Sequence, residues 1–107
     1  MNSANYQNFV NTNCKPYVNK PYLVIALAEE VGEISGWYKK VVLKKNKNLK
    51  KGKLTKQDLK EECGDVLFYL TRLSKLYGWS LEDIMRANVD KLVGEEKDKQ
   101  KAVKQDG

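Results

Sequence analysis

The chain has 107 residues and a formal net charge of +6, from 20 Lys and Arg against 14 Asp and Glu. This length predicts a single domain with one modest core, and two cysteines, Cys14 and Cys63, are too few for a disulfide framework or a zinc site. The sequence has no histidine, which excludes His-based triads, His metal ligands and His acid–base catalysis. A bound metal would need carboxylate ligands, which favour hard cations such as Mg²⁺ or Mn²⁺.

The positive charge is concentrated in one stretch. Residues 39–60, called here the basic segment, hold ten lysines and one acid, a local balance of +9 that leaves −3 for the rest of the chain. Such a segment is a candidate for binding nucleic acid. No apolar run approaches the roughly 20 residues that span a bilayer, and the polar residues 1–5 do not resemble a signal peptide. We therefore expect a cytoplasmic protein with no membrane partner.

The first half of the chain predicts two helices. Residues 2–13 form a short candidate helix, and Pro21 suits the first turn of the next. From residue 22 to about 43, apolar residues recur at steps of three and four, which is typical of a helix with one buried face: Leu23, Leu27, Ile34, Trp37 and Val41. Residues 46–52 are rich in Lys and Asn without periodicity and predict a loop.

The second half predicts two more helices and no strand. Thr55 and Asp58 form a capping-box pattern that begins a helix to about residue 77, and Gly78 ends it. Its apolar stripe consists of Leu59, Val66, Tyr69, Leu73 and Leu76. Ser80 and Asp83 form a similar box before a last helix over about residues 81–93. We expect residues 1–93 to form the domain and residues 94–107 to form a charged, flexible tail.

Four acids fall on the apolar stripes of the two long helices. Glu30 lies inside the earlier stripe with Glu33 at its edge, and Glu62 lies at the centre of the later stripe with Asp65 three residues on. Residues three apart are neighbours on a helix, so antiparallel packing would bring four carboxylates together. Unpaired buried carboxylates cost several kcal/mol, which a divalent cation would offset. The alternative is ordinary surface acids, or acids neutralised by lysine.

Two acidic motifs resemble the EExxE…ExxD signature of the MazG-like, all-α nucleoside triphosphate pyrophosphohydrolases, which are related to dCTP pyrophosphatases and dimeric dUTPases. Residues 29–33 read Glu-Glu-Val-Gly-Glu, residues 62–65 read Glu-Cys-Gly-Asp, and residues 88–92 match the family's Asn-x-x-Lys-Leu element. The resemblance covers about residues 21–93. It implies an all-α, four-helix-bundle-like domain with two long, antiparallel, acid-bearing helices, a short N-terminal helix and a C-terminal helix.

The resemblance also implies a reaction, the Mg²⁺-dependent cleavage of a (d)NTP between its α- and β-phosphates to give (d)NMP and pyrophosphate. The positions that match the Mg²⁺ ligands are Glu30, Glu33, Glu62 and Asp65. Glu29 matches a less certain acid that would orient the attacking water, or would simply be a solvated surface acid. Metals that bridge the phosphates stabilise charge and lower the pKa of a bound water, so this chemistry requires no histidine.

Several further residues match or suggest substrate contacts. Tyr69 matches a substrate-contacting tyrosine of dCTP-specific relatives, and Asn88 and Lys91 match nucleotide contacts, with Lys91 on the phosphates. From the basic segment, Lys40 is a candidate for the outer phosphates. Trp37 or Tyr38 could stack on a base, although Trp37 and Tyr69 both also suit a core. In dCTP-specific relatives a tryptophan stands at the position of Lys40, so a preference for cytosine is not implied.

The family forms homodimers or dimers paired into tetramers, with sites near subunit contacts, and we expect the same here. Two other functions stay open at this point. The chain could be a basic helical nucleic-acid-binding module that uses the basic segment, or a non-catalytic helical interaction protein that binds Mg²⁺ structurally. The nucleic-acid hypothesis gives no reason for acids within apolar stripes, and we rank it below the hydrolase.

Overall fold

A computed structural model describes residues 1–14, 19–43 and 55–106 of the chain. All secondary structure in this part is helical, which confirms the all-α class. The elements are α1 (Ser3–Asn13), α2 (Lys20–Tyr38), a π-helical turn η1 (Lys39–Leu43), α3 (Lys56–Leu76) and α4 (Leu81–Asp106). The loop predicted at residues 46–52 lies outside the described residues. None of the described helices is long and apolar enough to cross a membrane.

The two long helices begin where their capping residues predict. The Asn19 side chain accepts a hydrogen bond from the Tyr22 amide at 2.9 Å, and Pro21 occupies the first turn of α2. At the start of α3 the capping box is complete: the Asp58 amide donates to Thr55 Oγ1 at 3.2 Å, and the Thr55 amide donates to Asp58 Oδ2 at 2.7 Å. These bonds satisfy amides that have no partner within the helix.

The turn between α3 and α4 also follows its local sequence. Gly78 has φ +75°, the left-handed conformation that glycine adopts without strain. Ser80 and Asp83 bond reciprocally, because the Ser80 amide donates to Asp83 Oδ2 at 2.9 Å and the Asp83 amide donates to Ser80 Oγ at 3.0 Å. The predicted end of α3 and the predicted start of α4 are therefore confirmed.

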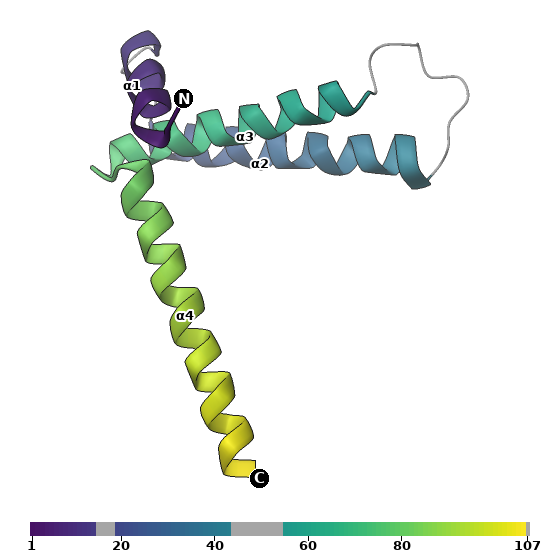
Figure 1. Ribbon diagram of the computed structural model, residues 1–107. Helices are drawn as coiled ribbons and strands as arrows, with labels where there is room; N and C mark the ends of the chain where they lie inside the picture. The colour runs from purple at the N-terminus through teal and green to yellow at the C-terminus, as the bar shows by residue number, and fades with distance from the viewer. Residues whose placement is uncertain (15–18, 44–54, 107) are drawn as a thin grey trace.

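Helices α2 and α3 lie side by side and antiparallel as a long hairpin (Figure 1), which is the most extensive packing in the described structure. On α2 the buried positions include Leu23 and Trp37, both from the predicted stripe. On α3 the most buried side chains are Thr71 and Ser74, whose hydroxyls donate to carbonyls of their own helix at 2.7 Å. The sequence pattern missed these two because they are polar, and the internal hydrogen bonds make their burial tolerable.

Helix α1 lies over the end of the hairpin where α2 begins and α3 ends (Figure 1). Its Val10 side chain is 1% exposed, and Gln7 Oε1 accepts a hydrogen bond from the Leu81 amide at 2.7 Å, which joins α1 to the start of α4. Phe9, the residue before Val10, is 57% exposed. Helix α1 therefore buries a narrow face.

Helix α4 projects away from the hairpin (Figure 1), and Leu81 is its one buried residue among those whose side chains are described. The predicted helix end near residue 93 is wrong, because α4 continues to Asp106. Residues 95–102 are mostly Glu, Lys, Gln and Ala, which are good helix formers, and Lys91 pairs with Glu95 one turn away at 3.9 Å. Large apolar side chains of α4 stay about half exposed: Met85, Val89, Leu92 and Val93.

Candidate metal centre

Three carboxylates meet between the two long helices. Glu30 of α2 and Glu62 and Asp65 of α3 each offer one oxygen, and these oxygens all lie within 4.8 Å of one another. Glu30 and Glu62 are half-buried and Asp65 is exposed. Two ligands on opposite sides of a Mg²⁺ ion lie about 4.2 Å apart, since each bond is about 2.1 Å. The oxygens of the acid cluster, as we call these three residues, thus lie close enough together to bind one such cation after small movements of their side chains.

The helix faces explain why these acids meet. Leu23 and Trp37 are 1% and 9% exposed, and they set the rotation of α2 so that its stripe faces inward. Glu30 follows Leu23 by seven residues, two helical turns, and so lies on the same face. On α3, Glu62 precedes Asp65 by three residues and Tyr69 by seven, which places all three toward one side.

The electrostatics of the cluster suit a cation. A hydrogen bond that protonated Glu62 donates to the Glu33 carboxyl, together with burial and the charges of Glu33, Asp65 and Glu30, raises the pKa of Glu62 from 4.5 to about 7. Burial and the charges of Glu33, Asp65 and Glu29 raise the pKa of Glu30, which a hydrogen bond from Glu62 partly offsets. Each of these shifts is typical of carboxylates that have no positively charged partner among the described residues.

Two buried carboxylate oxygens of the cluster also lack a hydrogen-bond partner among the described residues. Oε2 of Glu30 and Oε2 of Glu62 are both inaccessible to solvent and accept no hydrogen bond within the described part of the chain. An ionised carboxylate oxygen in such a position is costly unless a proton or a cation satisfies it. The donor set, all carboxylate oxygen, fits a hard divalent cation such as Mg²⁺ or Mn²⁺.

The remaining two acids of the motif lie beside the cluster. Glu33 is exposed and falls outside the group of three, although its carboxyl is close enough to Glu62 to accept its proton. Glu29 is exposed on the same turn as Glu30 and acts on it through its charge. The sequence predicted that four carboxylates converge. The structure brings three of them together and places the fourth, Glu33, next to Glu62.

Two tyrosines lie within electrostatic range of the cluster. The Tyr69 phenol is half-buried, and burial, the Tyr22 phenol and the charges of Glu30 and Asp65 raise its pKa, against a lowering by Arg72. The substrate contact that the resemblance implies for Tyr69 stays a prediction. The other is Tyr6 of α1, whose pKa is raised by burial, by Cys14 and by Asp65. The sequence analysis did not single out Tyr6 as a site residue, although its spacing of four from Val10 indicates the same helix face.

Two candidate substrate contacts of α2 and η1 lie away from the cluster. Trp37 is buried at the far end of the hairpin from α1, and its indole N–H donates to the Thr55 carbonyl at 3.0 Å. Trp37 thus packs α2 against the start of α3, which is the core role that its spacing also suits, and its stacking on a base stays a prediction. Its neighbour Tyr38 is 52% exposed. Lys40 is exposed in the π-helical turn, ten residues beyond Glu30 and so about 15 Å along the helix.

The candidate contacts on α4 do not reach the acid cluster within one chain. Asn88 and Lys91 are exposed on the projecting helix (Figure 1), and Lys91 pairs with Glu95. Helix α4 packs mainly on α1 near its first residues, which leaves its middle far from the hairpin. The expectation that these two residues join the acids is therefore not met inside the protomer.

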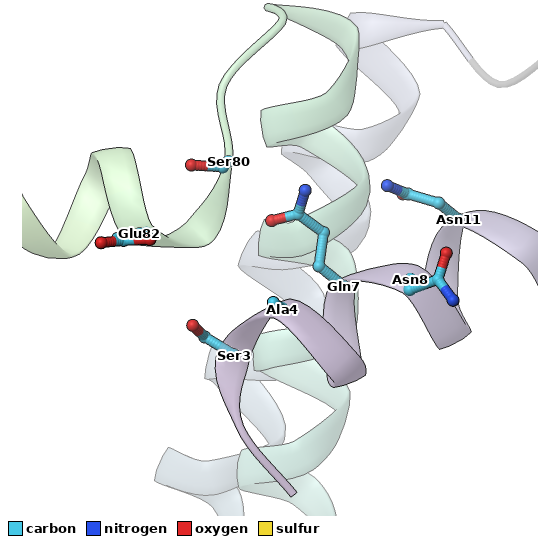
Figure 2. A pocket seen from close by; sticks show the side chains of 7 residues that line it. All are labelled: Ser3, Ala4, Gln7, Asn8, Asn11, Ser80 and Glu82. Atoms are coloured by element: carbon cyan, nitrogen blue, oxygen red, sulfur yellow. The ribbon is translucent and has the colours of Figure 1, made fainter.

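A separate hollow lies between α1 and the start of α4 (Figure 2). It has a volume of about 180 Å³ and is lined by Ser3, Ala4, Gln7, Asn8, Asn11, Ser80 and Glu82. Ligand pockets usually measure about 300–1,000 Å³, so this one is too small to enclose a nucleotide. It shares no residue with the acid cluster.

Comparison with known proteins agrees with this geometry. Residues 20–99 match the MazG nucleotide pyrophosphohydrolase domain. Over 37 residues the chain is 51% identical to the uncharacterized protein YvdC of Bacillus subtilis (strain 168), and the aligned stretch covers 35% of each protein. No solved structure matches the chain significantly. The matched domain contains α2, α3, all acids of the cluster and most of α4, but not α1.

Proposed function

Because the chain belongs to the MazG nucleotide pyrophosphohydrolase domain family, we propose that it is a Mg²⁺-dependent enzyme that hydrolyses a (d)NTP between the α- and β-phosphates. The products would be a (d)NMP and pyrophosphate. The observation that carries the proposal is the meeting of Glu30, Glu62 and Asp65, with two buried carboxylate oxygens that have no donor in the described part of the chain. Mn²⁺ would be expected to substitute for Mg²⁺ at such an all-oxygen site.

In this proposal Glu30, Glu62 and Asp65 hold the cation and Glu33 completes the ligand set from the adjacent turn. When bound, Mg²⁺ would neutralise the phosphates and lower the pKa of a coordinated water. Glu29 is exposed beside Glu30 and is free to orient the attacking water and accept its proton. Tyr69, half-buried beside Glu30 and Asp65, contacts the substrate.

The phosphate contacts require a second copy of the chain. Lys91 and Asn88 stand on α4, away from the cluster of their own protomer, so we propose that they reach the site of a partner subunit. The exposed apolar face of α4, which includes Val89 and Leu92, would be covered in the same contact. A homodimer, or a tetramer made of two dimers, would meet both needs. Lys40 remains a candidate for the outer phosphates.

The test is pyrophosphate release from a panel of NTPs and dNTPs with Mg²⁺ and after EDTA treatment. Glu30→Gln and Asp65→Asn should each lower the rate at least a hundredfold, because each removes a charged ligand, while the helical circular dichroism signal stays unchanged. Glu61→Gln is a matched control, since Glu61 is an exposed neighbour of Glu62 outside the cluster. No release from any nucleotide by the folded protein, together with salt-sensitive binding of duplex DNA, would favour the nucleic-acid-binding alternative.

A further inference from the structure

Arg72 of α3 stands in line with Asp65, the exposed acid of the cluster. It follows Asp65 by seven residues within one regular helix, which is two turns less about 20°. Tyr69 follows Asp65 by four residues and Glu62 precedes it by three, so both lie within about 60° of it around α3. Arg72 therefore shares the face of α3 on which the acid cluster forms.

The Arg72 side chain reaches back along α3 toward the cluster. Its guanidinium carbon lies over the Phe68 ring, 5.5 Å from the centroid, and Phe68 is one turn nearer to Asp65. Phe68 in turn meets the Tyr69 ring edge-on, with centroids 5.2 Å apart. All three side chains are half-buried. These contacts hold the positive charge at the level of Phe68, which is about 4.5 Å along the helix axis from Asp65.

The lysines of α2, η1 and α3 are placed less favourably for the cluster. Those at the start of α3 are turned at least about 120° around the helix from Glu62. The others stand nine or more residues, at least about 13 Å along their helix, from the nearest acid of the cluster. The first group is Lys56 and Lys60, and the second is Lys20, Lys39, Lys40 and Lys75.

Arg72 lies beside the acids without taking the place of a cation. Neither buried oxygen, Oε2 of Glu30 or Oε2 of Glu62, accepts a hydrogen bond from it. Its charge does act nearby, because it lowers the pKa of Tyr69 against the raising effects of burial and of neighbouring groups that include Asp65. The acid cluster thus has room for a metal ion, with a fixed positive charge on the same helix face.

From this geometry we infer that the Arg72 guanidinium binds a phosphate group of the metal-bound triphosphate within the same protomer. The inference rests on the proposed function, and the contact adds to those proposed from a partner subunit. A guanidinium presents several N–H donors in one plane and can bind two phosphate oxygens at once, which an ammonium group cannot. Because Asp65 is exposed, a phosphate chain can extend from the cation toward Arg72.

The experiment compares Arg72→Gln and Arg72→Lys with wild type, by calorimetric binding of inorganic tripolyphosphate in Mg²⁺ and by KM in the nucleotide panel. Loss of a charge-assisted hydrogen bond should weaken tripolyphosphate binding and raise KM, each roughly ten- to a hundredfold. Arg72→Lys keeps the charge without the planar donors and should lose less. Lys75→Gln removes the same charge from an exposed residue three positions further along and should behave as wild type.

A second measurement separates a phosphate contact from a role in positioning the acids. The rise in Tm that Mg²⁺ alone produces should be no smaller in Arg72→Gln than in wild type, because no cluster acid is changed. A parallel loss of the Mg²⁺ response would overturn the inference, as would unchanged tripolyphosphate binding in Arg72→Gln or an equal loss in Lys75→Gln.

The same experiment distinguishes this inference from the proposed function. Unchanged tripolyphosphate binding and KM in Arg72→Gln, with an active wild type, would refute the contact and leave the hydrolase proposal standing. Tripolyphosphate binding that depends on Arg72 and Mg²⁺, in a folded protein that hydrolyses no nucleotide, would support the contact and refute the hydrolase. Absence of tripolyphosphate binding by wild type would overturn the contact.

Discussion

Glu62→Gln should stabilise the metal-free protein at alkaline pH while removing its response to Mg²⁺. In the folded chain the hydrogen bond to Glu33, burial and neighbouring acids raise the pKa of Glu62 from 4.5 to about 7. The folded protein therefore holds this proton more tightly than the unfolded chain does. Its free energy of unfolding falls as the pH rises from about 4.5 to about 7, and above that range the ionised carboxylate destabilises the fold by the full amount.

The size of the penalty follows from the same shift. The difference between 4.5 and about 7 corresponds to at most about 3 kcal/mol. Water reaches this half-buried group, and its screening reduces the figure to about 1–2 kcal/mol. Because 1 kcal/mol shifts the Tm of a domain of this size by about 4–8 °C, Glu62→Gln should raise Tm by roughly 5–10 °C at about pH 8.

The assay is thermal unfolding by circular dichroism, in EDTA and then in millimolar Mg²⁺, at about pH 4.5 and about pH 8. Mg²⁺ should raise the Tm of wild type at the higher pH and leave the Tm of Glu62→Gln nearly constant. Glu61→Gln, the same change one residue earlier on an exposed face, should do neither. A variant no more stable than wild type at about pH 8 in EDTA, or a gain of equal size at both pH values, would refute the account of mutually repelling carboxylates.

Two further predictions test residues outside the acid cluster. Val89→Glu places a charge on the exposed face of α4 and should give monomers in sedimentation. Activity should be lost as well, because Asn88 and Lys91 would no longer reach a partner subunit. An active oligomer would contradict the proposed subunit contact. Trp37→Phe removes the 3.0 Å bond to the Thr55 carbonyl and should cost about 1 kcal/mol of stability with KM unchanged. A raised KM would instead indicate that Trp37 contacts the substrate.

Features decided within one or two helical turns were predictable from the sequence. The capping box of Thr55 and Asp58, the left-handed Gly78 and the placement of Glu30 and Glu62 within apolar stripes all appear in the structure as expected. Each depends on residues no more than about seven positions apart, where the 3.6-residue repeat fixes the geometry. The same repeat predicts which face each acid occupies, although not which acids meet across helices.

Contacts between distant segments were decided by tertiary packing alone. The register of α2 against α3 brings Asp65 to Glu30 and leaves Glu33 at the side, and the direction of α4 carries Lys91 away from the cluster. The burial of Trp37 and the approach of Tyr6 depend on surfaces more than fifteen residues apart. The sequence by itself therefore determined four helices and the carboxylate chemistry of the candidate cation site. Only the fold decided which side chains share that site, because no local periodicity specifies how two helices pack.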